Sequence, residues 1–281
     1  MSNKTDVEVS DSFFTTIDLG NSEWWREEYG FFGELYFNGD HSLLGYLDSV
    51  PLPVPERSVY DVNGLISLLG LQEGQRLLDV PCGYGRHSVQ LAARGFDVTG
   101  IDINSFFLDK AAEAARSRGV SLKLRSQDMR SLDYDQEFGA VLNLCYSFGF
   151  FRSEEENMRV LENFYKALKP GGKYLMNTDV NMPRVRQGTY KFNEERELVN
   201  GGKLIIRERY NPATRRMDGV WTVSSSDGTE QTNDYSVRVY EEDEFRDLCL
   251  KAGFSSCQVY SSWSAAPYDP EAEEIYFVAV K

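Results

Sequence analysis

Residues 77–88 contain side chains whose types and spacing are suited to binding a nucleotide-like ligand. Leu77–Val80 is a short, largely apolar run that predicts a buried strand, and Asp79 stands within it. Gly83 and Gly85 follow directly. Glycine at such a turn adopts backbone angles that other residues avoid, and it lets a ligand approach the chain without a Cβ in the way. The pattern therefore predicts a strand, a tight turn and then a helix.

A second acidic residue, Asp102, completes this pattern. It follows a predicted strand over Phe96–Ile101, 23 residues after Asp79. In a right-handed strand–helix–strand unit, the end of the second strand lies beside the turn that follows the first. The carboxylate of Asp102 is thus expected to accept hydrogen bonds from the hydroxyls of a ribose.

The residues around the turn discriminate between nucleotides. A dinucleotide-binding turn has a third glycine, but Ser88 stands at that position. Asp79 would repel a pyrophosphate and would attract a cationic ligand. S-adenosylmethionine (SAM) has an ammonium and a sulfonium and no phosphate, so it fits this pattern.

The D-x-x-x-G-x-G motif of Asp79, Gly83 and Gly85, with an acidic strand end downstream, resembles the cofactor site of class I, seven-strand SAM-dependent methyltransferases. The L-K-P-G-G turn at 168–172 is a second feature similar to that family. The resemblance covers residues 57–180 and 240–281. It implies an α/β, Rossmann-like fold with a seven-stranded, mostly parallel sheet and helices on both faces.

The resemblance also implies which residues hold the cofactor. The glycine turn and Asp79 would contact the methionine end of SAM, and Asp102 the ribose. Asp128 would bind the adenine amino group, while Met129 packs on the ring. The implied cofactor-binding residues are Asp79, Gly83, Gly85, Asp102, Ile103, Asp128, Met129 and Leu144.

Four segments are expected along the chain. Residues 1–56 form an aromatic N-terminal cap that includes helix, and residues 57–180 form the SAM-binding core. Turn signals at Asn200-Gly201 and Asp227-Gly228 predict antiparallel hairpins inserted after the fifth strand, over residues 181–240. Residues 241–281 return to the core and supply a final antiparallel strand pair. The insertion could serve as a second wall of the substrate pocket or as a subunit interface.

The acceptor side of the site is expected from aromatic residues and one histidine. Residues 24–37 are rich in aromatic side chains that could cap the cofactor cleft. A second aromatic group, residues 145–151, follows the strand predicted at 138–144. His41 is one of two histidines and is the available candidate for a base. The expected acceptor-side residues are Tyr29, Tyr36, His41, Tyr146 and Phe148.

Composition restricts the partners. The net charge of −14 opposes binding to nucleic acid or to an anionic membrane surface. The four cysteines have no metal-ligand spacing, so free thiols in a reducing compartment and no metal site are expected. No signal peptide and no apolar run of membrane-spanning length are visible, which predicts a soluble, cytoplasmic protein. The insertion and the aromatic segment are also compatible with a homo-oligomer.

These patterns predict methyl transfer from SAM to a small molecule, with an amine nitrogen of the kind found in antibiotic tailoring as the acceptor. An in-line transfer of this kind depends mainly on positioning. One alternative is a small-molecule O-methyltransferase that uses His41 as base. Another is an NAD(P)-dependent oxidoreductase, and a third is a SAM-binding protein without turnover.

Overall fold

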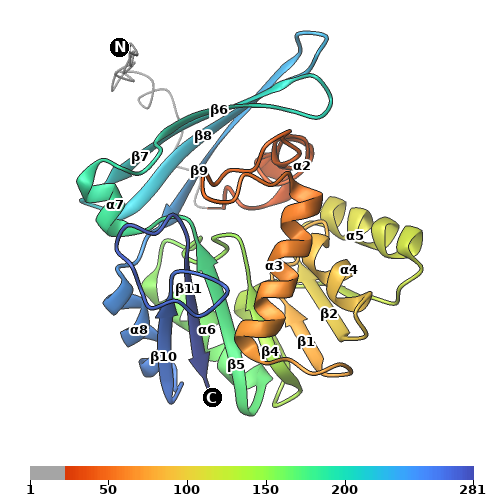
Figure 1. The fold of residues 1–281 in the computed structure, drawn as a ribbon, viewed down its shortest axis with the longest axis vertical. Coiled ribbons are helices and arrows are strands. Elements are labelled where there is room, and N and C mark those ends of the chain that lie inside the picture. Colours follow the sequence, from red (N-terminus) through yellow and green to blue (C-terminus); the bar gives the residue numbers. More distant parts are fainter. Residues whose placement is uncertain (1–22) are drawn as a thin grey trace.

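The computed structural model describes residues 23–281, and within them a central sheet carries the fold (Figure 1). Seven strands follow the order β10-β11-β5-β4-β1-β2-β3. Strands β1 to β5 are parallel, β11 runs antiparallel to β5, and β10 runs antiparallel to β11 at the edge. The predicted fold class and the predicted antiparallel strand pair are therefore confirmed. The strands are β1 (Arg76–Asp79), β2 (Asp97–Asp102), β3 (Lys123–Ser126), β4 (Phe138–Asn143), β5 (Leu168–Thr178), β10 (Ser256–Tyr260) and β11 (Ile275–Val280).

Helices cover both faces of this sheet, because successive strand residues point to opposite sides. Leu77 packs with α3 and α4 on one face, and its neighbour Leu78 packs with α6 and α8 on the other. Gly70 caps the C-terminus of α3 and Gly119 that of α5, and both have left-handed backbone angles, which glycine adopts readily. The helices of the core are α3 (Val54–Leu69), α4 (Arg86–Ala92), α5 (Ser105–Arg118), the 3-10 turn η2 (Met129–Ser131), α6 (Glu154–Ala167) and α8 (Glu242–Lys251).

The antiparallel insertion after β5 forms a second sheet in the order β6-β7-β8-β9. It lies over the end of the core where the parallel strands finish (Figure 1). Helix α7 (Met182–Gln187) leads into it. The strands are β6 (Asn193–Glu197), β7 (Lys203–Asn211), β8 (Arg216–Ser224) and β9 (Glu230–Arg238). The antiparallel hairpins predicted after the fifth strand are therefore present, and their first strand, β6, has the sequence Asn-Glu-Glu-Arg-Glu without an apolar residue.

The N-terminal segment lies between the two sheets. It comprises the 3-10 turn η1 (Glu27–Tyr29) and the helix α2 (Glu34–Asp40). Gly39 of α2 packs so closely against β8 that an added Cβ would lie 3.1 Å from the Trp221 ring. The ring of Tyr36 stacks on the same Trp221 at a centroid distance of 5.2 Å and an interplanar angle of 9°. Aromatic packing thus fixes this segment beneath the insertion.

A buried arginine fastens α3 to the end of the sheet. The Arg57 guanidinium bonds Asp61 and Glu274, each at 2.6 Å, and all three side chains are almost completely buried. Glu274 also accepts hydrogen bonds from Asn177 at 2.8 Å and from Tyr276. Removal of one member of a buried charged group leaves its partners uncompensated, which typically costs about 3–5 kcal/mol.

We therefore predict that Arg57→Met lowers the free energy of unfolding by about 3–5 kcal/mol, because Asp61 and Glu274 lose their shared cation. Urea unfolding followed by circular dichroism measures this. Arg118→Met, at the exposed end of α5, is the matched control and should change stability by less than about 0.5 kcal/mol. Equal stability of the two variants would contradict the structural role of Arg57.

Candidate active site

The glycine turn after β1 has the geometry that the sequence predicts. Gly83 and Gly85 have φ angles of +52° and +81°, in the left-handed region. A Cβ at Gly85 would lie 2.7 Å from the Cβ of Ala111 in α5, so the turn also packs too tightly for a side chain there. A Cβ at Gly83 would meet no protein atom within 4 Å, which leaves the space beside that residue open.

Asp102 is held against this turn at the end of β2. Its Oδ2 accepts a hydrogen bond from the backbone N–H of Gly83 at 2.8 Å, and its Oδ1 accepts one from the N–H of Asn104 at 2.9 Å. Burial raises the pKa of Asp102 to about 6, although these backbone donors favour the ionised form. The carboxylate is thereby fixed in orientation, and each oxygen keeps a lone pair for a ligand hydroxyl.

Asp79 is 1% exposed at the end of β1. Ser88 Oγ donates a hydrogen bond to its Oδ2 at 2.5 Å. Burial raises the pKa of Asp79 to about 7. The serine that replaces the third glycine of a dinucleotide motif therefore supports the acidic residue of the same motif, a link that spacing alone does not reveal.

Asp128 and Met129 follow β3, where the resemblance predicts the adenine contacts. The Asp128 carboxylate accepts a hydrogen bond from the backbone N–H of Arg130 at 2.8 Å and forms an ion pair with its guanidinium at 2.6 Å. Arg130 in turn contacts Glu156 of α6. Asp128 is thus held in place by Arg130 before any ligand arrives, and its role toward adenine stays a prediction.

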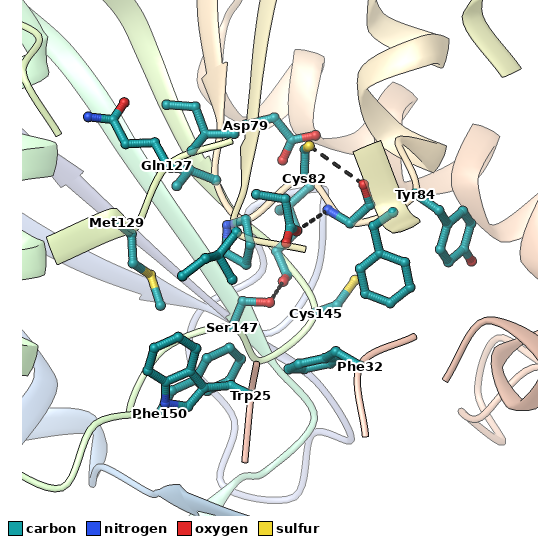
Figure 2. A pocket seen from close by; sticks show the side chains of 18 of the residues that line it. Trp25, Phe32, Asp79, Cys82, Tyr84, Gln127, Met129, Cys145, Ser147 and Phe150 are labelled. Carbon is teal, nitrogen blue, oxygen red and sulfur yellow. Dashed lines mark hydrogen bonds between the residues drawn. The ribbon is translucent and has the colours of Figure 1, made fainter. Parts of the chain in front are cut away.

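A first cavity opens at these strand ends and encloses about 850 Å³ of space free of protein atoms. Figure 2 shows the aromatic side chains of Trp25, Phe32 and Phe150 across the pocket from Asp79. The turn residue Gly85 is not part of the lining. The other seven predicted cofactor residues all line this cavity: Asp79, Gly83, Asp102, Ile103, Asp128, Met129 and Leu144.

A second cavity of about 1230 Å³ adjoins the first beneath the inserted sheet. Its walls come from the N-terminal segment, the loop after β4, the end of β5 and the strands of the insertion. The two cavities share Phe32, Tyr36, Arg86, Cys145, Ser147 and Phe150. A ligand in one cavity therefore lies next to a ligand in the other.

The chain between the two cavities has strained backbone. Cys145 and Tyr146 have φ angles of +59° and +57°, which residues other than glycine rarely adopt. Asn177 holds both: its Oδ1 accepts the N–H of Cys145 at 3.0 Å, and its backbone carbonyl accepts the N–H of Tyr146 at 2.9 Å. Asn143 Nδ2 donates to the carbonyl of Ser147 at 3.0 Å. The two asparagines fix this loop in one conformation.

Sequence analysis predicted none of the carboxylates that line the second cavity, which include Asp179 and Glu208. Asp179 follows β5, and no described side chain donates a hydrogen bond to it, while burial raises its pKa. Glu208 of β7 accepts hydrogen bonds from Tyr190 and Tyr235, and burial raises its pKa to about 7. The position of Asp179 just after a predicted parallel strand was a signal for a site residue. Glu208 had no such signal, because strand pairing decides to which side of the inserted sheet its side chain points.

The predicted acceptor-side residues separate into two groups. Tyr36 lines both cavities, and Tyr146 lines the second one, where its hydroxyl is buried without a hydrogen-bond partner among the described residues. Phe148 lines neither cavity, because the loop turns it into the core, with its ring 5.2 Å from that of Phe245. The side chain of Tyr29 lies outside the described residues.

His41 also lines neither cavity. It caps the end of α2, where its Nδ1 lies 2.6 Å from the carbonyl oxygen of Phe37 and its ring packs against Tyr84. The structure thus places the predicted base outside the walls of the pocket.

Comparisons with known proteins agree with this geometry. Residues 77–172 match the model of a methyltransferase domain. A putative methyltransferase of Geobacillus is 26% identical over 75% of this chain and 87% of its own length. The glycine/sarcosine N-methyltransferase of Halorhodospira halochloris is 28% identical over 73% and 75% of the two chains. The dTDP-4-amino-2,3,4,6-tetradeoxy-D-glucose N,N-dimethyltransferase of Saccharopolyspora spinosa is 26% identical over 65% of this chain and 72% of its own length.

Solved structures share the fold. The CcbJ methyltransferase from Streptomyces caelestis superposes with a TM-score of 0.67 at 17% identity, covering 81% of this chain and 96% of that one. SAM-bound CalS10, an amino pentose methyltransferase from Micromonospora echinaspora, has a TM-score of 0.59 at 20% identity and coverages of 82% and 92%. Residues 77–172 are thus a methyltransferase domain, and the chain is a SAM-dependent methyltransferase. The expected methyltransferase activity and the expected cofactor are confirmed, and the oxidoreductase alternative is not supported.

The first cavity of this methyltransferase fits SAM chemically. Its charged lining consists of Asp79, Asp102, Asp128 and Arg86, so carboxylates outnumber cations. Burial lowers the pKa of the neighbouring His87 to about 4, which keeps that ring neutral. Such a lining favours a ligand with an ammonium, a sulfonium and ribose hydroxyls and disfavours a pyrophosphate. When bound there, SAM supplies an activated methyl group.

No group of three or more histidine, cysteine, aspartate or glutamate side chains among residues 23–281 could hold a metal ion. Within the same range, no helix is both long enough and apolar enough to cross a membrane.

We predict that Asp102→Asn weakens the binding of S-adenosylhomocysteine by roughly 10- to 100-fold, because a charged acceptor for the ribose hydroxyls becomes neutral. Isothermal titration calorimetry measures the change. Asp97→Asn, at the opposite end of the same strand, is the control and should bind as the wild type does. Unchanged affinity in Asp102→Asn would contradict the ribose role.

The affinity for S-adenosylhomocysteine should also depend on pH. The pKa of Asp79 in the empty site is raised to about 7, whereas the ammonium of the ligand favours the ionised carboxylate. Below pH 7 binding must displace a proton, so affinity should fall by up to about tenfold per pH unit between pH 7 and 6. Calorimetry at pH 8, 7 and 6 tests this, and Asp79→Asn should bind more weakly with a flatter profile. A flat profile in the wild type would contradict the role of Asp79.

Proposed function

We propose that this methyltransferase transfers the methyl group of SAM to the nitrogen of a small-molecule amine bound in the second cavity. The observation that carries the proposal is the pair of carboxylates, Asp179 and Glu208, in an aromatic-walled cavity next to the cofactor cavity. Aromatic faces and carboxylates both attract ammonium groups.

The aromatic walls would orient the acceptor rather than react with it. Phe31, Tyr36, Trp221 and Tyr235 form a connected set of rings, with centroid distances of 4.8–6.2 Å between contacting pairs. The orphaned hydroxyl of Tyr146 offers a polar contact on the same side. Holding the acceptor in line with the methyl group supplies catalysis by proximity, which can lower the barrier by about 7–11 kcal/mol.

The relatives support the same acceptor class. Two of them carry names that specify N-methylation, one of glycine and sarcosine and the other of a nucleotide-linked amino sugar. We extend the proposal to an amine used in antibiotic tailoring, with amino sugars as the first class to test. Action in the cytoplasm is consistent with the free cysteines of the described chain. A homo-oligomeric state stays a prediction.

O-methylation with His41 as base is the competing proposal. It requires this histidine to reach the acceptor, whereas the side chain lies outside both cavity walls. The two proposals therefore differ in what they expect of both the acceptor and the histidine.

We predict that the purified chain methylates at least one of four amines, glycine, benzylamine, tyramine and D-glucosamine, and does not methylate 4-methylphenol. Mass spectrometry of the products identifies the modified atom, and tyramine offers nitrogen and oxygen in one molecule. His41→Ala should keep turnover within about threefold of the wild type, because its ring lies outside both cavity walls. Methylation of the phenols alone, with a large loss in His41→Ala, would reverse the assignment.

A further inference from the structure

Glu208 belongs to a polar row that crosses three strands of the insertion. It pairs in register with Gly219 of β8, and Gly219 pairs in register with Tyr235 of β9. A Cβ at Gly219 would lie only 2.2–2.5 Å from atoms of the Tyr235 phenol ring. The missing side chain therefore lets the phenol of Tyr235 cross β8 and donate its hydrogen bond to Glu208 Oε1.

A second phenol holds the other carboxylate oxygen. Tyr190, in the segment before β6, donates to Glu208 Oε2 at 2.8 Å. No lysine or arginine among the described residues forms an ion pair with Glu208, although several arginines lie on the same sheet. Glu208 is thus a carboxylate fixed from two sides, without a counterion, in the wall of the second cavity.

The surroundings of Glu208 adjust its proton affinity. Burial raises its pKa to about 7, the hydrogen bond from Tyr235 lowers it, and the negative charge of Asp179 raises it. Tyr190 lowers it and Glu194 of β6 raises it by smaller amounts. The cavity is also lined by the ionisable side chains of Tyr36, Asp40, Tyr46, Arg86, Cys145, Tyr146, Arg184, Lys191, Arg196, Glu273 and Glu274. This carboxyl can therefore gain and lose a proton near neutral pH.

An amine acceptor that binds as its ammonium form needs such a group. An alkylamine with a pKa near 10 is almost entirely protonated at neutral pH, with roughly one molecule in 10³ present as the free base. The ammonium has no lone pair and cannot accept a methyl group. The aromatic, acidic cavity described above attracts the ammonium form, so the proton has to leave after binding.

We propose that Glu208 takes up the proton that the bound ammonium loses before methyl transfer. This rests on the proposed function. The N–H bond breaks, and the proton moves to the Glu208 carboxylate. The nitrogen lone pair then forms the bond to the methyl carbon while the electrons of the carbon–sulfur bond stay on sulfur. The product leaves as a methylated ammonium, and Glu208 releases its proton to water.

The test is the pH dependence of kcat/KM, at saturating SAM, for whichever of the four amines reacts fastest. Under this condition the ratio reports the ionisation of the cofactor-bound enzyme before the amine binds, and the effect of Asp79 on cofactor binding does not enter. In the wild type the rate should fall as the pH drops through about 7, when Glu208 becomes protonated. Glu208→Gln should lose this acid limb and reduce kcat by roughly 10²- to 10⁴-fold.

Two neighbours should move the acid limb in opposite directions. Tyr235→Phe removes a hydrogen-bond donor to the ionised carboxylate of Glu208. The pKa that defines the acid limb should therefore rise by roughly half a unit to one unit. Asp179→Asn removes a negative charge near Glu208, so the pKa that defines the acid limb should fall by a similar amount. A purely structural defect in either variant would lower the rate without moving the limb.

Glu230→Gln, at the exposed start of β9, is the matched control and should behave as the wild type. Thermal melting and S-adenosylhomocysteine affinity establish that each variant is folded. If Glu208→Gln does not fold, the opposite shifts in the other two variants still decide the matter.

The outcomes separate the two proposals. Turnover of an amine with an acid limb that stays fixed in Tyr235→Phe and Asp179→Asn would overturn the role of Glu208 and leave N-methylation standing. No methylation of any of the four amines by the wild type would overturn both.

Discussion

The structure depends on buried charge that is compensated across elements far apart in the sequence. Arg57 joins α3 to Glu274, which leads into β11, and Glu274 accepts a hydrogen bond from Asn177 at the end of β5. Asn177 in turn holds the backbone of Cys145 and Tyr146 in the left-handed region. Strained backbone persists only where its surroundings determine it. The shape of the wall between the two cavities is therefore linked to the ion pair of Arg57 and Glu274, and Glu274 itself lines the second cavity.

The cofactor side could be predicted from sequence because its geometry is local. Asp79, Gly83 and Asp102 belong to one strand–turn–helix–strand unit, whose handedness and spacing determine where each residue lies. The match of a family model to residues 77–172 covers this same region. Even there, the ion pair between Asp128 and Arg130 was not visible, because it depends on side-chain conformations in a loop.

The acceptor side could not be predicted, because it depends on contacts that are distant in sequence. Glu208 faces the cavity as a consequence of its register with Gly219, and a shift of one residue would turn it outward. Phe148 was expected in the pocket, but two consecutive left-handed residues before it reverse the local direction of the chain. The aromatic segment at 24–37 forms a short turn and a short helix rather than a long one, because Gly30 and Gly33 interrupt it.

The shared wall of the two cavities has a thermodynamic consequence. Phe32, Tyr36 and Phe150 contribute to both cavities, so any movement of these rings on occupation of one cavity alters the shape of the other. Linkage requires such an effect to be reciprocal: if the cofactor strengthens acceptor binding, the acceptor strengthens cofactor binding by the same factor. If binding is coupled in this way, departure of one product lowers the affinity for the other. The order of product release is then connected to the packing of these three aromatic side chains.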